Sequence, residues 1–435
     1  MPTPQTLLPW LIGGAIGAGG ILQGLHWRSS NSSAEIAAIE AQLRLASEEN
    51  EILKRENDSL RSLAQGGGEL AVPPELIARI EKELNLRFLS SPVVHQIASE
   101  ELRDRIAAAI ESRFGPAGID DRQDAYSFIG WLRPGDNLLA QLTAVRSVGA
   151  RAWFDDVTGE GWMTDRFDAQ NIPDQAALVR ILARILLHQH FPPPPSYPGD
   201  DAARAREALH QGAAAGSEAR FYTANARAIG FMPMTENNAA EQLLASLPPF
   251  IQGLTTFPQI EGKGLADTLH IQGDAPFQNA FRSPPSTTRA VFYPGEAAVT
   301  LPELELPNPP EAPFLTESAG MLGLRLWLEP LGDAGSALEI ASCWKNDRYI
   351  LFPDGEASSA VLWEIELTQA AAADQLESVA LDLTAALGGQ TESAKLGKTL
   401  STPEGRHLTI TRTSPTRIRF INAALPSTAA QFSTP

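Results

Sequence analysis

The segment Ala176–Phe191 constrains the fold of this chain more than any other stretch. Its apolar residues recur at helical spacing, and four prolines follow at positions 192–195, where a helix cannot continue. Arg180 and Arg184 are four residues apart, so they lie on one face of the predicted helix. The same pattern is typical of an ordinary amphipathic helix with solvated arginines, so its meaning depends on the rest of the chain.

Composition limits the classes of partner. The 435 residues carry a formal charge of −18, which repels phosphate backbones, so nucleic acid is not an expected partner. Cys343 is the only cysteine, which excludes an internal disulfide and a cysteine-based metal site. The length predicts one large domain or two ordinary ones.

The N-terminal stretch contains no Asp, Glu, Lys or Arg in residues 1–27. Residues 7–27 are long and apolar enough for a bilayer span, and Trp10 and Trp27 lie near its ends. A cleaved signal peptide is the alternative, but such a peptide normally begins with a basic region, which is absent here. We therefore expect residues 1–30 to form a transmembrane anchor in the membrane.

A heptad pattern follows in residues 36–63, within a predicted coiled coil over 34–64. Asn50 and Asn57 fall at a positions, where a buried asparagine fixes the register and favours a parallel dimer. A single amphipathic helix docked on its own domain is the alternative. The pattern predicts a parallel homodimer, followed by a flexible linker over 65–72.

The remaining sequence predicts one globular domain over 73–425 and a disordered tail over 426–435. Hairpins are expected at 151–163 and 407–421, strands at 349–352 and 360–367, and helices at 99–113, 124–143, 176–191, 200–229, 320–342 and 369–387. The expected fold class is α+β and mainly helical.

Several of these elements resemble a family of secreted or membrane-anchored bacterial zinc metallopeptidases. The resemblance starts from a hairpin, a helix ending in Gln189-His190-Phe191, and a second helix carrying Ala208-Leu209 and Gly212. In the family, the first helix carries His-Glu-x-x-His, and a Glu on the second helix is the third zinc ligand. Similar stretches lie at Ala152–Gly161, Pro284–Thr288, Tyr293-Pro294 and Cys343–Tyr349, so the likeness runs from about Phe88 to about Leu383.

The sequence departs from the family pattern at the metal-ligand and catalytic positions. Arg180 and Arg184 stand where the two histidines belong, Ile181 replaces the catalytic glutamate, and Gln211 replaces the third ligand. Arginine does not lose its proton to become a ligand, and isoleucine cannot act as a base. The resemblance therefore implies a degenerate zincin-like domain, a pseudopeptidase that holds no metal or other cofactor and is not an enzyme.

The leading hypothesis is a non-catalytic, membrane-anchored, dimeric binding or scaffolding module at the cell envelope. The resemblance implies a single-pass protein of the bacterial inner membrane with a periplasmic or external domain, and a peptide or protein partner in the former cleft. The two arginines could hold an anion such as a peptide carboxylate. Alternatively, the two arginines pair with an acid of the chain itself, such as Asp200, Asp201 or Glu207. We favour this internal pairing because an unpaired buried charge is costly.

Two other hypotheses remain open. The first is a metal-dependent hydrolase with a relocated site formed by His188, His190 and His210. His188 and His190 are two residues apart, so a helix points them about 200° away from each other. The second is an assembly protein in which the coiled-coil stalk is the functional part.

Overall fold

The computed structural model describes residues 68–194, 196–229, 238–296, 304–330, 334–387 and 395–433. Two compact units are distinguished, Met1–Gln65 and Gly66–Pro435, and the described residues belong to the second. The predicted anchor and coiled coil, with Asn50 and Asn57, lie outside the described residues.

Helices make up most of the described secondary structure. They are α3 (Pro74–Leu84), α4 (Ser99–Phe114), α5 (Pro116–Ile129), α6 (Leu138–Ser147), α7 (Ile172–His190), α8 (Asp200–Ala224), α9 (Ala226–Ile229), α10 (Asn238–Ser246), α11 (Pro249–Phe257), α12 (Lys263–Gln272), α13 (Asp274–Arg282), α14 (Thr288–Phe292), α15 (Gly320–Leu328), α16 (Ala334–Ser342), α17 (Ala370–Leu387) and α18 (Pro426–Gln431). A π-helical turn, η2 (Pro258–Gly262), joins α11 to α12.

The strands of the described ranges form two sheets. The smaller sheet has the order β1-β3-β2, in which β1 (Val94–Ile97) is parallel to β3 (Gly161–Thr164) and β2 (Ala152–Phe154) is antiparallel to it. The larger sheet is antiparallel, with the order β4-β5-β6-β9-β8-β7. Its strands are β4 (Leu315–Glu317), β5 (Trp344–Pro353), β6 (Ser359–Leu367), β7 (Leu400–Ser401), β8 (His407–Ser414) and β9 (Arg417–Ala423).

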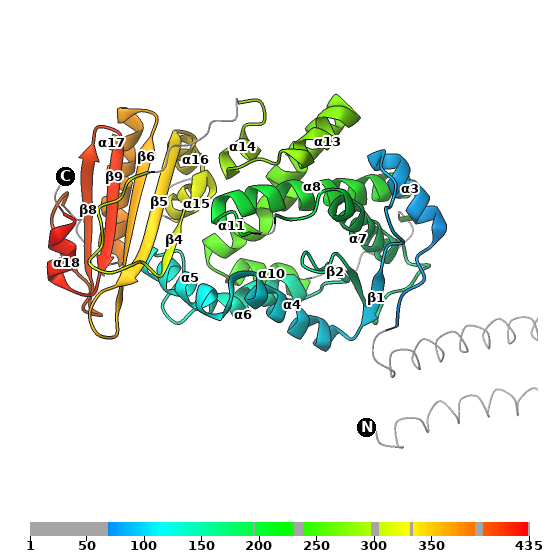
Figure 1. Ribbon diagram of the computed structural model, residues 1–435, viewed down its shortest axis with the longest axis horizontal. Coiled ribbons are helices and arrows are strands. Elements are labelled where there is room, and N and C mark those ends of the chain that lie inside the picture. Colours follow the sequence, from blue (N-terminus) through cyan, green and yellow to red (C-terminus); the bar gives the residue numbers. More distant parts are fainter. Residues whose placement is uncertain are drawn as a thin grey trace, which may run out of the picture. The chain divides into compact units, whose positions relative to one another are not determined.

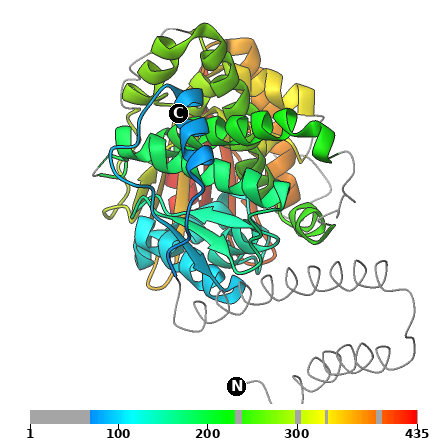
Figure 2. The same ribbon diagram turned by 90° about the vertical axis from the view of Figure 1, so that its right-hand side faces the viewer.

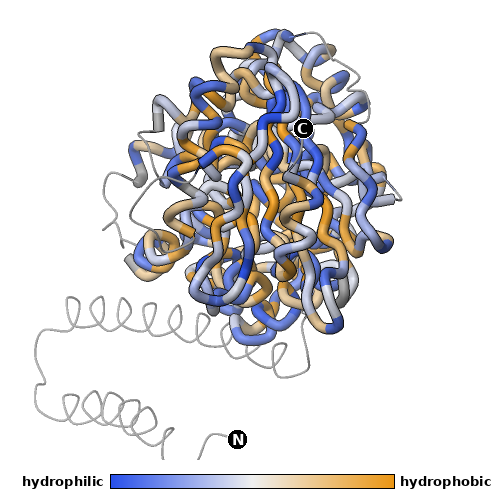
Figure 3. Tube along the Cα trace, turned by 90° about the vertical axis from the view of Figure 1, so that its left-hand side faces the viewer, coloured by the Kyte–Doolittle hydropathy of each residue, from blue (hydrophilic) through white to orange (hydrophobic). Residues whose placement is uncertain are grey.

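The larger sheet has buried apolar side chains on both of its faces. Hydrophobic positions recur along its strands (Figure 3). On one face, Trp363 and Phe420 pack with Trp327 of α15 at ring-centre distances of 5.0 and 5.7 Å. On the other face, Phe352 contacts Phe432, which follows α18. The predicted disordered tail over 426–435 is therefore wrong over 426–433, the part that the structure describes: Pro426–Gln431 forms α18, and Ala429 and Phe432 cover the sheet.

Helices α7 and α8 pack against each other, and α7 also contacts α3 and β2 (Figures 1 and 2). Residues all around α7 are buried, so it is a core helix rather than an amphipathic helix at the surface. Helix α8 crosses η2 closely at Gly212, where a side chain would overlap the backbone of Gly262. This crossing holds η2 beside the middle of α8.

The structure confirms both predicted hairpins and the helices over 99–113, 176–191 and 369–387, with shifts of a few residues at their ends. The helix predicted over 124–143 is wrong, because α5 ends at Gly130 in a left-handed conformation (φ 94°) and α6 starts after Asn137, whose side chain caps it. The predicted linker over 65–72 is wrong from residue 68 onward. Leu70 N donates a hydrogen bond to Val94 O at 2.7 Å, which ties this segment to β1.

The fold class expected from the sequence, an α+β zincin-like domain behind a transmembrane helix and a parallel dimeric coiled coil, needs correction. Over the six ranges that the structure describes, no helix is both long and apolar enough to cross a bilayer. The longest of them, α8, has 25 residues and carries seven charged side chains. The fold class is therefore restated as an α+β protein with two sheets.

Candidate functional site

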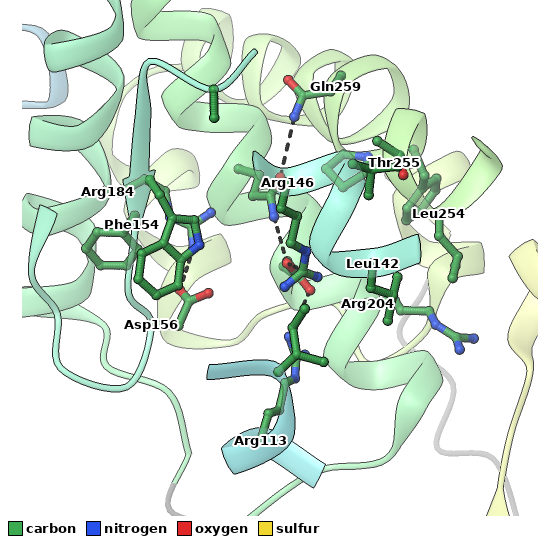
Figure 4. Close-up of a pocket in the computed structure, with 18 of the residues that line it drawn as sticks. Arg113, Leu142, Arg146, Phe154, Asp156, Arg184, Arg204, Leu254, Thr255 and Gln259 are labelled. Carbon is green, nitrogen blue, oxygen red and sulfur yellow. Dashed lines mark hydrogen bonds and ion pairs between the residues drawn. The ribbon is translucent and has the colours of Figure 1, made fainter. Parts of the chain in front are cut away.

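A cavity of about 470 Å³ lies between α7, α8, the β2–β3 hairpin, α4, α6 and η2 (Figure 4). Four acids line it, Asp156, Asp200, Glu207 and Glu218, and so do seven arginines. Seven positive and four negative side chains give the lining a formal charge of +3, in a chain whose net charge is −18. The arginines are Arg113, Arg122, Arg146, Arg151, Arg180, Arg184 and Arg204.

The structure brings the four positions singled out in the sequence to this one cavity. Arg180, Ile181 and Arg184 of α7 and Gln211 of α8 all line it. Ile181 is buried, and it packs so closely on Gly161 of β3 that a side chain at Gly161 would overlap it. The isoleucine thus fixes α7 on the small sheet.

Arg184 has the more enclosed of the two α7 guanidinium groups. Its side chain is 8% exposed, forms an ion pair with Asp156, and stacks 4.8 Å from the ring centre of Phe154. Arg180 is 31% exposed and pairs with Glu218 at 3.2 Å. Each arginine therefore pairs with an acid of the chain itself, which is the internal pairing that we favoured over a bound anion.

The acids predicted as partners of these arginines were the wrong ones. Asp200 pairs with Arg122 and Arg204, and Glu207 pairs with Arg113 and Arg146. Asp201 accepts hydrogen bonds from Thr288. The partners of Arg184 and Arg180 are instead Asp156 of the hairpin turn and Glu218 of α8. For Arg184 the physical reason is that the β2–β3 turn brings Asp156 within hydrogen-bond distance of its guanidinium group, an interaction that a dashed line marks in Figure 4.

Glu207 is the centre of a second charged group. Its carboxylate lies 3.1 Å from Arg113 and 3.8 Å from Arg146, and it accepts a hydrogen bond from Gln211 Nε2 at 2.6 Å. Gln259 Nε2 of η2 donates in turn to Gln211 Oε1 at 3.4 Å. Burial opposes ionisation of Glu207, but Arg113 and Arg146 outweigh it and hold the pKa of this carboxyl below its ordinary value.

The arginines of these two groups have donors to spare. A guanidinium offers five N–H groups, whereas Arg113, Arg146, Arg180 and Arg184 each contact one carboxylate among the described residues. The lining between them is apolar, with Ile110, Leu142, Val145 and Leu254 among its residues. A cavity of this size, with an apolar wall and a few converging charges, is suited to a small amphipathic anion.

Asp200 belongs to a different network at the start of α8, in which its carboxylate is saturated with hydrogen-bond donors. Its carboxylate is 2% exposed and accepts hydrogen bonds from Arg122, Arg204 and the hydroxyl groups of Tyr126, Tyr197 and Tyr349. Burial opposes ionisation, but Arg204 and Arg122 hold the pKa of Asp200 well below its usual range. In Figure 4, Arg204 points away from Arg113 and Arg146.

Other residues that carry the resemblance hold the scaffold together. Asp347 accepts hydrogen bonds from Trp344 Nε1 at 2.9 Å and Trp363 Nε1 at 2.8 Å, and from the backbone N–H groups at the start of α15. Thr288 donates to Asp201 Oδ1 through both its backbone N–H and its hydroxyl group. These motif residues are structural in this fold.

The alternative three-histidine site is not assembled. His188 Nε2 contacts Asp156 O at 3.1 Å, and His190 Nε2 contacts Arg87 O at 2.7 Å. His210 is buried edge-on against Phe281, and burial together with Arg206 holds its pKa well below its ordinary value. In the parts of the chain that the structure covers, no three His, Cys, Asp or Glu side chains come together as metal ligands.

Among the cavity residues that sequence reasoning missed, five belong to the two charged groups described above: Arg113, Arg146, Asp156, Glu218 and Gln259. One of them had a usable signal, because Glu218 lies seven residues after Gln211 and therefore on the same face of α8. The others come from α4, α6, the hairpin turn and η2, and only the tertiary fold brings them together. The π-helical turn that carries Gln259 is itself of a kind that often occurs at functional sites.

Fold and site together define an α+β protein with an arginine-rich cavity beside a core helix pair. Compared with protein-family models, with curated proteins and with solved structures, the chain matches none of them.

Proposed function

We propose that this chain is a non-catalytic, metallopeptidase-like protein that binds a peptide ligand in the arginine-lined cavity without hydrolysing it. One observation carries the proposal. The four positions at which the sequence resemblance places metal ligands and a catalytic base line a single cavity, and they hold two arginines, an isoleucine and a glutamine.

The chemistry of these side chains supports binding rather than hydrolysis. Guanidinium groups stay protonated, so they repel a divalent cation and attract carboxylates. Ile181 cannot take a proton from water. It is buried against Gly161, so its role is to pack α7 on the small sheet. Gln211 is engaged between Glu207 and Gln259.

Equilibrium dialysis of the full chain against a mixture of N-acetylated tetrapeptides, with and without added Zn²⁺, tests the proposal. We expect mass spectrometry to find intact peptides enriched on the protein side and no cleavage products under either condition. Arg184→Met should reduce the enrichment, whereas Arg87→Met, which removes an exposed arginine outside the cavity, should not. Zinc-dependent cleavage, or no enrichment of any peptide, would contradict the proposal.

A further inference from the structure

The side chain of Asp156 differs from the other acids of the cavity lining because, among the residues that the structure describes, it makes no hydrogen bond that stabilises the hairpin turn on which it lies. The preceding residue, Asp155, is 6% exposed and accepts hydrogen bonds from the backbone N–H groups of Val157 at 2.9 Å and Thr158 at 3.4 Å, which fixes the turn. The Asp156 side chain is 49% exposed, and within the described residues its one hydrogen-bond partner is Arg184. Its carboxylate could leave the arginine without disturbing the turn.

The pair between Asp156 and Arg184 is joined at a single point. One hydrogen bond connects Arg184 Nη2 to Asp156 Oδ1, whereas an arginine and a carboxylate prefer two parallel hydrogen bonds. Arg184 is held in place by its burial and by the ring of Phe154. A carboxylate that approached from the cavity could therefore make the fuller contact that Asp156 does not make.

The surrounding charges favour such an exchange. Around the cavity centre, Arg113, Arg146, Arg180 and Arg184 face three acids, Asp156, Glu207 and Glu218. If Asp156 turned outward, four arginines would face two acids, which leaves a local charge of +2 for an incoming anion. Both Arg184 and Arg113 attract the carboxylate that Asp156 now places there.

We propose that Asp156 stands in for a ligand carboxylate on Arg184, and that the cavity binds a peptide-like ligand whose carboxylate displaces it. This inference rests on the proposed peptide-binding function and names its ligand class. The apolar wall formed by Leu142, Val145, Leu254 and their neighbours takes an apolar side chain next to that carboxylate. Asp156 then acts as an internal competitor that lowers the affinity of the empty cavity.

Three probes distinguish the sources of the carboxylate: N-acetyl-Ala-Phe as the free acid, its C-terminal amide, and N-acetyl-Asp-Phe-amide. Isothermal titration calorimetry on the full chain should give the tightest binding for one of the two carboxylate probes, and at least about tenfold weaker binding for the uncharged amide. A preference for the free acid identifies a peptide C-terminus, and a preference for the aspartyl amide identifies an acidic side chain.

Substitutions then test the displacement of Asp156. Asp156→Asn removes the competing charge and should tighten binding of the preferred carboxylate probe by about three- to tenfold. Glu160→Gln is the matched control, because it removes a charge from the same turn at a side chain outside the cavity lining, and it should leave the affinity unchanged. Arg184→Met should weaken binding of the carboxylate probe by at least about tenfold and leave the affinity for the uncharged amide unchanged.

Two groups of results would overturn different claims. If the uncharged amide binds as tightly as the acids, or if Asp156→Asn leaves the affinity unchanged or weakens it, the exchange is wrong and peptide binding still stands. If none of the probes binds to the wild-type chain or to Asp156→Asn, while thermal melting shows both to be folded, peptide binding itself is wrong.

Discussion

Helix α8 carries charged centres in two places, and their surroundings differ. At its start, Asp200 is 2% exposed and its carboxylate accepts six hydrogen bonds, so the carboxylate itself is saturated with donors. Seven residues later, Glu207 lies at a cavity whose arginines have unused donors. Both centres are rich in arginine and both line the cavity, but the carboxylate of Asp200 accepts six hydrogen bonds, whereas that of Glu207 is contacted by Arg113, Arg146 and Gln211 alone among the described residues.

The difference separates structural from binding arginines. A buried ion network with complete partners specifies one conformation, and it is costly to break because the remaining charges stay buried. Arginines that line a cavity with a surplus of positive charge keep the capacity to bind a further anion. Substitutions in the network around Asp200 should therefore cause large losses of stability, whereas substitutions of the arginines around Glu207 and of Arg184 should mainly weaken ligand binding.

The largest effect is expected for Asp200→Ala. The substitution leaves Arg122 and Arg204 buried without their shared carboxylate, so we expect a loss of about 3–5 kcal/mol or failure to fold. Urea denaturation measures it as a lower midpoint with an unchanged slope. A loss below about 1 kcal/mol would show that the network is not a structural centre.

Gly320→Ala tests the packing beside the same end of α8. Gly320 has a φ of 72°, and a methyl group there would overlap the carboxylate of Asp201. We expect a loss of about 3 kcal/mol, from the left-handed backbone and the overlap together. Thermal melting would contradict this packing if the midpoint stayed within about 1 °C of the wild-type value, which corresponds to roughly 1 kcal/mol or less for a unit of this size.

Asp201 should make stability depend on pH. The pKa of Asp201 is raised to about 7, chiefly by burial and also by Asp347 nearby, which together outweigh the hydrogen bonds from Thr288 and the charge of Arg204. The folded chain then keeps a proton that the unfolded chain loses near pH 4, so stability falls as pH rises from about 4 to about 7.

The expected loss is roughly 2.5 kcal/mol between pH 5 and pH 8, because about two pH units of this range lie below the folded pKa of about 7 and each corresponds to about 1.4 kcal/mol. Asp201→Asn should have a flatter profile in this range. Glu317, whose pKa burial and Asp200 also raise, stays in both proteins and so cancels in the comparison. Parallel profiles for the two proteins from urea denaturation would show that Asp201 does not hold a proton in the fold.

The smallest effect on stability is expected for Arg180→Met. Both members of the pair with Glu218 are partly exposed, so the substitution should change the free energy of unfolding by less than about 1 kcal/mol. Arg122→Met is the matched comparison at the saturated end, where we expect several kcal/mol. Equal losses in urea denaturation would remove the distinction between the two groups of arginines.

Much of this fold could be predicted from local sequence signals. The prolines after Phe191 end α7, and alternating apolar residues locate β6, β8 and β9. The hairpin signal places β9 beside β8, but the rest of the strand order could not be predicted, because nothing along β9 reveals that β6 is its other neighbour. The three-residue strand β4 is too short to give a pattern of its own.

The candidate site was only half predictable. Spacing alone places Arg180 and Arg184 on one face of a helix, and the resemblance adds Gln211 from the next helix. The acids that pair with the arginines depend on where the β2–β3 turn and the far end of α8 lie in space. Asp156 was missed for this reason, although it is the residue on which the binding hypothesis now depends.

A crystal structure of the full chain with bound N-acetyl-Ala-Phe, or with N-acetyl-Asp-Phe-amide if that probe binds more tightly, tests the central claim most directly. We predict that the probe's carboxylate makes two hydrogen bonds to Arg184 and that the side chain of Asp156 turns toward solvent. A probe bound elsewhere, with the pair between Asp156 and Arg184 intact, would contradict the assignment of this cavity as a carboxylate-binding site.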